Sequence, residues 1–123
     1  LTKKLNHGNL KTSRSFLDME DAMRAYWLAA RSGKIGEVYN IGGNKNMPLI
    51  FFLRQLIKLS NSSIILSLDK KLLRTNDINI QIPDSNKFFK HTGWKPKISF
   101  QKSLNKLIEE CRERVRKEFK LNK

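Results

Sequence analysis

The sequence has few of the features that mark secreted, membrane-spanning or metal-binding proteins. Its 123 residues include one cysteine, Cys111, so an internal disulfide is excluded and a reducing compartment such as the cytoplasm is expected. No apolar run approaches the ~20 residues that span a bilayer, so we expect no membrane contact of that kind. His7 and His91 have no second histidine or cysteine at ligand spacing, so the sequence predicts no metal site.

The beginning of the chain also lacks two features. The first residue is Leu1 rather than Met, and no charged leader followed by an apolar stretch and a cleavage site comes after it. We therefore expect a segment of a longer protein without an export signal. Its length suits one small domain or part of a larger one, and we treat residues 1–123 as a single segment.

Acidic residues are scarce, with 11 Asp and Glu against 25 Lys and Arg and a net charge of +14. A charge of this size raises the possibility of a non-catalytic basic module that binds nucleic acid. The basic residues are spread along the whole chain, however, and form no stripe interleaved with stacking aromatic residues. We therefore do not expect nucleic acid to be the main partner and favour small anionic ligands such as diphosphates.

The hydrophobic pattern predicts an α/β protein with four helices and a few short strands. A first helix begins after its N-cap Asp18 and ends at Gly33 in the left-handed conformation. Residues 36–43 then predict a buried strand that joins a sheet formed mostly elsewhere. The apolar face expected for the first helix consists of Met19, Ala22, Met23, Tyr26, Trp27 and Ala30.

The second half of the chain contributes the other three helices. They are expected at 48–60, from Asp84 or Ser85 to 91 with Gly93 closing the turn, and from Ser99 to the C-terminus. Short strands are expected at 64–68 and 78–82. The stripe of the last helix is Phe100, Leu104, Leu107, Ile108, Cys111, Val115 and Phe119, which makes Cys111 a core thiol. Trp27 and Trp94 are expected to be packing residues.

Several short motifs follow one another in a set order. They are Gly8-Asn9-Leu10; Arg14 with Phe16; Arg24-Ala25-Tyr26-Trp27; 36–42; Leu73-Arg74 with Asp77; Asp84-Ser85-Asn86-Lys87; and Gly93-Trp94-Lys95-Pro96. Each motif is weak alone, but the ordered set is specific. It resembles the C-terminal part of the nucleotide-sugar dehydratases and epimerases of the extended short-chain dehydrogenase/reductase superfamily, most closely GDP-mannose 4,6-dehydratase and its relative GDP-6-deoxy-mannose reductase.

The resemblance implies a substrate-binding portion of a Rossmann-type enzyme whose cofactor-binding domain is absent from this chain. In the family, the arginines that match Arg14 and Arg74 contact the diphosphate, and the acid that matches Asp77 holds ribose hydroxyls. These residue types suit those roles, because a guanidinium pairs with two phosphate oxygens and a carboxylate accepts from two vicinal hydroxyls. By residue type alone, both arginines are ordinary surface residues, and an Asp77 that caps a turn is an equal alternative.

Departures from the family pattern surround these positions. Ser15 replaces the acid after the first arginine, and Thr75 replaces the proline after the second, so both arginines are expected to be less well supported. Pro48 and Phe51 stand where the family has a capping serine and an acid three residues later.

The chemical machinery of the superfamily is missing from this sequence. No glycine-rich G-x-x-G-x-x-G turn is present to receive the pyrophosphate of NAD or NADP, and neither Tyr26 nor Tyr39 is followed by a lysine four residues on. We therefore expect no catalytic residue here, no cofactor bound by this segment and no activity of the chain alone.

In the complete enzyme the resemblance implies NADP, a nucleotide-sugar substrate such as GDP-mannose, the absent Rossmann domain as a partner, and an assembly of identical subunits. The function predicted is that of GDP-mannose 4,6-dehydratase, with this segment binding the nucleoside diphosphate. GDP-6-deoxy-mannose reductase and a UDP-sugar 4-epimerase remain alternatives, because they share these residues.

Overall fold

The computed structural model describes residues 3–121, with side chains to residue 119. The chain is an α/β protein with two small sheets. In the first sheet, β1 and β4 are parallel; in the second, β2 lies between an antiparallel β3 and a parallel β5. In order, the elements are β1 (Lys3–His7), β2 (Ser13–Phe16), α1 (Met19–Ser32), β3 (Lys45–Pro48), α2 (Leu49–Ser60), β4 (Ile64–Leu68), η1 (Lys70–Leu72), β5 (Ile80–Gln81), α3 (Asn86–Thr92) and α4 (Phe100–Leu121).

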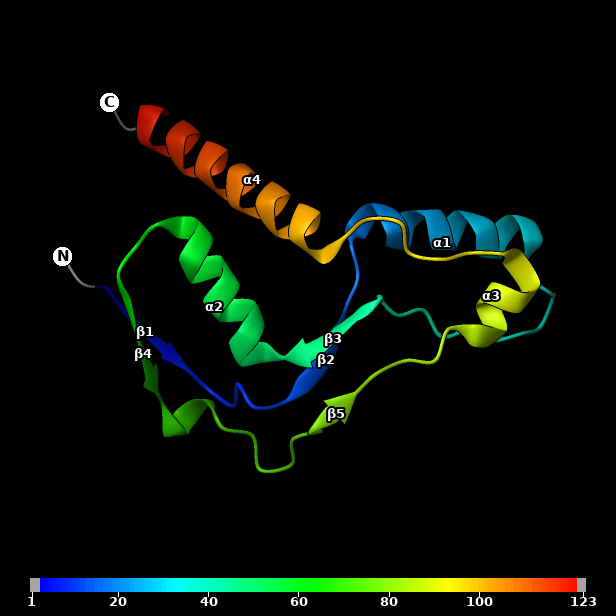
Figure 1. The fold of residues 1–123 in the computed structure, drawn as a ribbon, viewed down its shortest axis with the longest axis horizontal. Helices are drawn as coiled ribbons and strands as arrows, with labels where there is room; N and C mark the ends of the chain where they lie inside the picture. Colours follow the sequence, from blue (N-terminus) through cyan, green and yellow to red (C-terminus); the bar gives the residue numbers. More distant parts are fainter. Residues whose placement is uncertain (1–2, 122–123) are drawn as a thin grey trace.

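The helices form two pairs at the two ends of the molecule. Helix α1 packs against α3 at one end, and α2 packs against the first half of α4 at the other, with the strands along one side (Figure 1). The last turns of α4 extend past the end of α2. The chain is therefore elongated, with a separate small core under each helix pair.

The first core lies between α1 and α3. Ala25 from α1, Phe88 from α3 and Trp94 after α3 are buried there, with Tyr39 and Ile41 packed against them. Trp94 is only 2% exposed, which confirms its predicted packing role. The second core is aromatic and joins β2, α2 and α4: the rings of Phe16 and Phe52 stack with centroids 4.7 Å apart, and Phe100 meets Phe16 edge-on.

Helix α1 begins as predicted, but its buried face was predicted wrongly. The Asp18 side chain accepts a hydrogen bond from the Glu20 backbone N–H at 2.9 Å, which confirms the N-cap. The buried side holds Asp21 and Ala25, while the predicted apolar face is mostly exposed, including 65% of Trp27. The reason is that α3 and the segment after it pack onto the Asp21 side of the helix.

The end of α1 also differs from the prediction. Gly33 is extended, with φ −69°, and not left-handed. Glycine is still required there, because a Cβ atom would lie 2.4 Å from the Ala29 carbonyl oxygen. The left-handed conformation occurs instead at Gly93, which closes α3 as predicted.

The strand predicted at 36–43 is wrong for this chain. Residues 33–44 contain no strand, and Val38, expected to be buried, is 81% exposed. A strand needs a partner for its backbone groups, and none of the described strands pairs with this segment. Side chains hold it instead: Ser85 Oγ accepts from Gly42 N at 2.8 Å, and Lys87 Nζ donates to the Val38 carbonyl oxygen at 2.9 Å.

The later elements follow the predictions closely. Helices α2, α3 and α4 and strand β4 lie where expected, and β5 shortens the predicted strand 78–82 to two residues. Cys111 is the exception within α4, since it is exposed and not a core thiol. The apolar stripe that contains Cys111 continues past the end of α2, and Val115 and Phe119 are 49% and 72% exposed.

Candidate functional site

Arg14 lies in the middle strand of the second sheet, and its guanidinium is already engaged. The backbone of Arg14 pairs with Met47 of β3 and Gln81 of β5. Its Nη1 donates to the carbonyl oxygen of Ser13 at 2.9 Å and to that of Ile78 at 2.8 Å. Its Nη2 lies 3.5 Å from Asp77 Oδ1. Arg14 therefore ties β2 to the loop 73–79 that precedes β5.

Asp77 is held from a second direction. Its Oδ2 accepts a hydrogen bond from Asn9 Nδ2 at 2.9 Å, across 68 residues of sequence. Asn9 is itself oriented, because its Oδ1 accepts from the Lys11 backbone N–H at 3.0 Å. The structure thus brings two predicted residues together, Arg14 and Asp77. It adds Asn9, whose only sequence signal was its place in the Gly8-Asn9-Leu10 motif.

Arg74 lies in the same loop, three residues before Asp77, and its side chain is exposed. Within the described part of the chain, no hydrogen bond or ion pair to it is formed. The turn η1, which precedes this loop, passes close to the β1–β2 connection, since a Cβ on Gly8 would lie 2.6 Å from the Leu72 carbonyl oxygen. Arg74 is therefore close to Asp77 in sequence, and the described residues leave its donors available for an anion.

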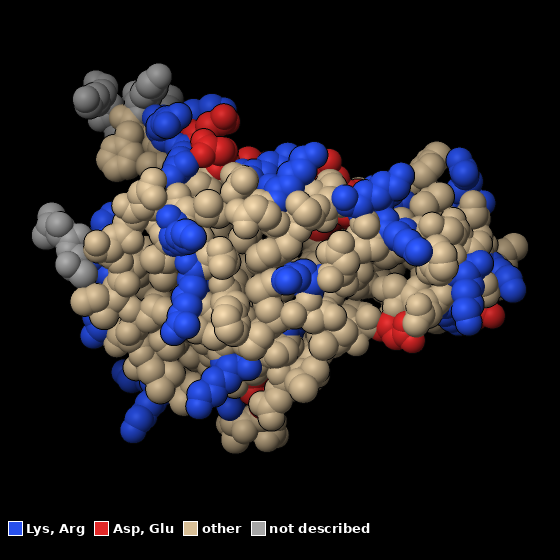
Figure 2. Space-filling model, viewed as in Figure 1, with Lys and Arg blue, Asp and Glu red and all other residues tan. Residues whose placement is uncertain are grey.

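The surroundings of this cluster are basic. Lys11, Lys70 and Lys71 are exposed next to it in sequence. Across the face drawn in Figure 2, the lysine and arginine side chains are scattered and not gathered in one stripe. Such a surface attracts small anions in general, and the face drawn in Figure 2 shows no continuous basic track of the kind that a nucleic acid backbone follows.

The cluster is separate from the three best-formed cavities of the described chain. Three cavities of about 500, 750 and 340 Å³ lie elsewhere, around Phe16 and Phe100, around Met47 and Phe51, and around Gly42 and Trp94. None of the three is lined by Arg14, Arg74 or Asp77.

The N-terminus of α1 does not fit the pyrophosphate of a nicotinamide cofactor. A pyrophosphate needs the free N–H groups and the positive end of a helix N-terminus. Helix α1 begins instead with Asp18, Glu20 and Asp21, which would repel it. Tyr39 is also engaged away from any ligand, since its hydroxyl accepts from Lys34 N at 2.9 Å and lies 2.7 Å from His91 Nδ1. We derive no catalytic step from these residues.

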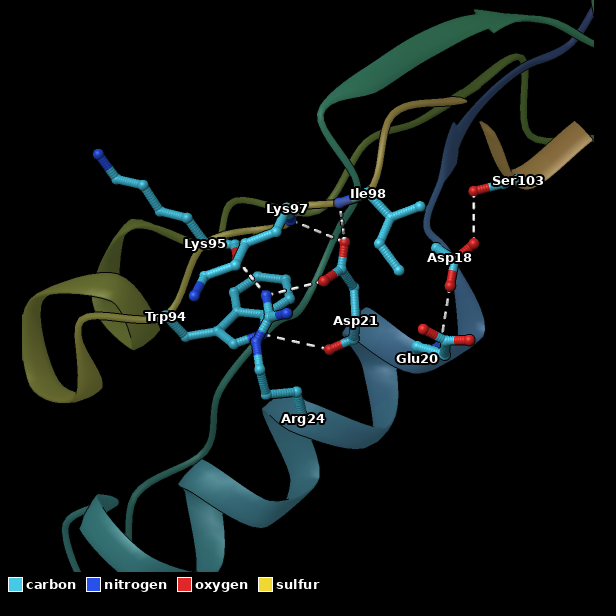
Figure 3. Close-up of polar contacts among 9 residues, drawn as sticks. All are labelled: Asp18, Glu20, Asp21, Arg24, Trp94, Lys95, Lys97, Ile98 and Ser103. Carbon is cyan, nitrogen blue, oxygen red and sulfur yellow. Dashed lines mark hydrogen bonds and ion pairs between the residues drawn. The ribbon is translucent and has the colours of Figure 1, made fainter. Parts of the chain in front are cut away.

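A buried carboxylate fixes the segment that follows α3 (Figure 3). Asp21 is fully buried, and its Oδ2 accepts from the backbone N–H groups of Lys97 and Ile98, both at 2.8 Å. Its Oδ1 lies 2.7 Å from Arg24 Nη2, an ion pair outside hydrogen-bond geometry. Arg24 also donates to the Lys95 carbonyl oxygen at 2.6 Å, so side chains of α1 bind the 95–98 segment at three backbone groups.

A second carboxylate joins α1 to α4. Asp18 Oδ2 accepts from Ser103 Oγ at 2.5 Å. This hydrogen bond, together with the Glu20 N–H and nearby Lys106 and Lys102, holds the pKa of Asp18 below its usual value of 3.8, although partial burial opposes the shift. Lys106 also pairs with Glu20, and that contact raises the pKa of the lysine. These contacts are structural and not part of the Arg14 cluster.

Comparison with known proteins shows the family. The family model described as "GDP-mannose 4,6 dehydratase" matches residues 1–107. The chain belongs to this family. Among curated relatives, GDP-6-deoxy-D-mannose reductase of Pseudomonas aeruginosa is 26% identical over 115 residues, covering 94% of this chain and 38% of the relative. The human dTDP-D-glucose 4,6-dehydratase is 33% identical over 113 residues, which cover 87% of this chain and 32% of the relative.

Solved structures agree on the fold. RMD from Pseudomonas aeruginosa complexed with NADPH superposes with a TM-score of 0.82 at 24% identity, covering 90% of this chain and 36% of that one. UDP-glucose 4-epimerase from Thermotoga maritima with UDP-glucose superposes with a TM-score of 0.80 at 23% identity. The match covers 93% of this chain and 36% of that one. The predicted fold class, an α/β portion of a Rossmann-type extended short-chain dehydrogenase/reductase, is confirmed.

The chain spans about a third of the length of these curated relatives, 38% and 32% in the two cases above. The relatives named for GDP-, dTDP- and UDP-sugars match to similar degrees, so they do not select one base.

None of the helices in residues 3–121 has the length and apolar character that crossing a membrane requires.

Proposed function

We propose that this chain is the nucleoside-diphosphate-binding part of an enzyme that modifies a nucleotide sugar, and that the enzyme is a GDP-mannose 4,6-dehydratase. The observation that carries the proposal is the contact between Arg14 and the loop that contains Asp77. The Arg14 guanidinium donates to the carbonyl oxygen of Ile78, 64 residues away in sequence, and forms an ion pair with Asp77. The ordered motifs pointed to these residues as one site, and the family match covers them all.

The side chains supply the chemistry that a nucleoside diphosphate needs. Arg74 presents a free guanidinium, whose planar donors pair with two phosphate oxygens at once. Asp77 presents a carboxylate that accepts from two neighbouring hydroxyls, as on a ribose. The excess of lysines nearby raises the local concentration of anions. The proposal thus gives Arg74 the diphosphate and Asp77 the ribose.

The reaction itself belongs to the complete protein. It would be NADP-dependent oxidation at the sugar C4, loss of water across C5 and C6, and return of the hydride; the residues described carry none of these steps. The chain alone is therefore inactive under this proposal, and the cofactor-binding part lies outside it. The names of the relatives support NAD or NADP as the cofactor and leave a 4-reductase or a 4-epimerase as alternatives.

Calorimetric titration of the purified chain tests the binding function. We expect GDP, and to a lesser degree UDP and dTDP, to bind in the millimolar range, because only one wall of the site is present. A control oligonucleotide should bind no more tightly than GDP. Tight oligonucleotide binding with a steep dependence on salt would contradict the proposal and favour a basic nucleic-acid module.

Arg74→Ala provides the matched variant. Loss of a charge-assisted contact should weaken GDP binding by about tenfold in the chain and raise KM by a similar factor in a complete enzyme. Arg31→Ala, at an exposed position in the last turn of α1, serves as the control and should change neither. Equal affinity of the Arg74 variant and the wild type would remove Arg74 from the site.

A further inference from the structure

We propose that the C-terminal half of α4 pairs with the same half-helix of a second copy of this chain, in antiparallel orientation around a two-fold axis near Glu113. This pairing is independent of the proposed function and needs no ligand. The surface concerned is formed by residues 107–119, nearly all of them beyond residue 107, where the match to the family model ends.

Two neighbouring rows of side chains run along α4, because residues four apart lie on the same ridge of a helix. The first row is buried or half-buried and contains Phe100, Leu104, Ile108 and Arg112. Both of its ends contact α2. The Phe100 ring meets that of Phe52 at 6.2 Å between centroids, and Arg112 Nη2 donates to the Leu59 carbonyl oxygen at 2.8 Å.

The second row, which we call the outer ridge, is exposed at every position. It contains Leu107, Cys111, Val115 and Phe119, with 40% of Leu107 and 72% of Phe119 exposed. In the commonest mode of helix packing, ridges of residues four apart on one helix fit into the grooves of another. An apolar ridge with this spacing therefore suits a second helix as its partner.

The charges beside the outer ridge select an antiparallel copy of the same helix. The adjacent row alternates in sign, with Lys106, Glu110, Arg114 and Glu118. In a parallel pair, each of these charges would meet its own kind. In an antiparallel pair centred near residue 113, Glu110 of one copy meets Arg114 of the other, twice by symmetry. Among the described residues, neither Glu110 nor Arg114 forms an ion pair.

The same register matches the apolar side chains and the charge of the helix. It places Leu107 against Phe119 of the second copy and Cys111 against Val115. Residues 108–121 carry four acids and five bases, although the chain as a whole has a net charge of +14. Repulsion between two copies is therefore small along this part of α4.

The rest of the chain leaves room for such a pair. Helix α2 packs only against the first half of α4 (Figure 1), so the two copies of α2 lie at opposite ends of the antiparallel pair. One ridge from each copy buries less than the ~1,600 Å² of a standard interface. We therefore expect a reversible dimer with a Kd of roughly 10–100 μM.

Sedimentation equilibrium of the purified chain tests the pairing. With rising concentration, the average mass should increase from 14.4 kDa toward twice that value. Val115→Glu places a charge in the outer ridge and should weaken association about a hundredfold. Ile65→Glu, at a similarly exposed apolar position on β4, is the control and should change nothing. A wild-type chain that stays monomeric up to about 1 mM would overturn the proposal, and so would undiminished association of Val115→Glu.

Cysteine cross-linking tests the orientation. Val115→Cys puts a thiol opposite Cys111 of the second copy, so mild oxidation should give a disulfide-linked dimer on a non-reducing gel. The wild type, whose Cys111 faces Val115, should remain largely unlinked, and so should Val115→Cys combined with Cys111→Ser. A wild-type dimer linked through Cys111 would indicate parallel pairing and overturn the proposal.

Exchange of charges tests whether the partner is a second copy. Glu110→Arg or Arg114→Glu alone should weaken association about tenfold, because symmetry sets like charges against each other at two places. The chain with both substitutions should recover the wild-type affinity, with an unchanged helix signal in circular dichroism. A double variant as weak as the single ones would contradict the antiparallel register and overturn the proposal.

Discussion

At the scale of single residues, the aspartates Asp18 and Asp21 join helix α1 to segments far along the chain. A fully buried carboxylate is tolerated only where its charge and lone pairs are matched. Asp21 meets this condition with two backbone N–H groups and Arg24. Its position on the buried side of α1 also explains why the helix turns its apolar Met and Trp side chains outward, since this acid and its partners occupy the inner side.

We predict that Asp21→Ala destabilises the chain by about 3 kcal/mol, because it removes three contacts and leaves the Lys97 and Ile98 N–H groups unsatisfied. Urea unfolding followed by circular dichroism would measure the change. Glu109→Ala breaks an exposed ion pair with Arg112 and should cost no more than about 0.5 kcal/mol. A loss at Asp21 as small as this control would show that the buried network is not stabilising.

The Asp18–Ser103 contact makes a prediction about pH. The pKa of Asp18 is lowered in the folded chain, so its contribution to stability is present above the usual value of 3.8 and is lost as the pH falls through the folded value. Ser103→Ala should therefore cost about 1 kcal/mol at neutral pH and progressively less below about pH 4. Unfolding measured from pH 2 to 7 checks this, with exposed Ser62→Ala as the control. A cost independent of pH would rule out the lowered pKa as its origin.

At the scale of elements, helix α2 forms in spite of its N-terminus. Pro48 is its N-cap, and no side chain accepts from the first turn. The helix is held by its packing on α4 and by Leu49 N and Ile50 N, which donate to the carbonyl oxygens of Thr12 and Leu10. Tertiary contacts thus replace the local signals that the sequence lacks at this point.

Restoring those local signals should stabilise the chain. Pro48→Ser with Phe51→Glu creates a capping box, because the extended backbone at 48 already has N-cap geometry. We expect a gain of about 1 kcal/mol in the free energy of unfolding, measured in urea. Gln55→Glu, one turn further along the helix, is the control for added charge. A double variant no more stable than the control would mean that the first turn of α2 gains nothing from capping.

At the scale of the whole molecule, the chain exposes far more surface than a compact protein of its size. Its accessible surface is 9783 Å² for 14.4 kDa, against about 6,800 Å² expected for a compact monomer of that mass. Apolar side chains contribute visibly, including Trp27 at 65% and Val38 at 81% exposed. The outer face of α1 and the side chain of Val38 thus leave apolar surface uncovered by the described chain.

We predict that the purified chain binds the dye ANS strongly under native conditions, because this apolar surface is open. Tyr26→Glu combined with Val38→Lys should reduce ANS fluorescence by about half or more, without loss of helix signal in circular dichroism. Ile65→Glu, an exposed apolar residue on β4, is the matched control. Weak ANS binding by the wild type would indicate that the chain covers this surface itself.

Local patterns predicted most of the secondary structure in this protein. The caps at Asp18 and Gly93 and the three- and four-residue spacing of α2 and α4 depend on groups within a few residues, so the sequence alone was sufficient there. The ordered motifs were also sufficient for the family. One local prediction failed, the left-handed conformation of Gly33. The other failures depend on neighbours far along the chain: the buried face of α1, the strand at 36–43 and the burial of Cys111.

For the candidate site as well, the sequence alone predicted some features and the tertiary structure decided others. Residue type and motif order selected Arg14, Arg74 and Asp77 from the sequence. Only the tertiary structure decided that Arg14 and Asn9 converge on Asp77 while Arg74 stays exposed, because these contacts join β2 and the β1–β2 connection to a loop more than 60 residues away. Sequence spacing determines which face of a strand a side chain occupies. The partner that it meets there depends on how the loops close, and that is a property of the folded chain.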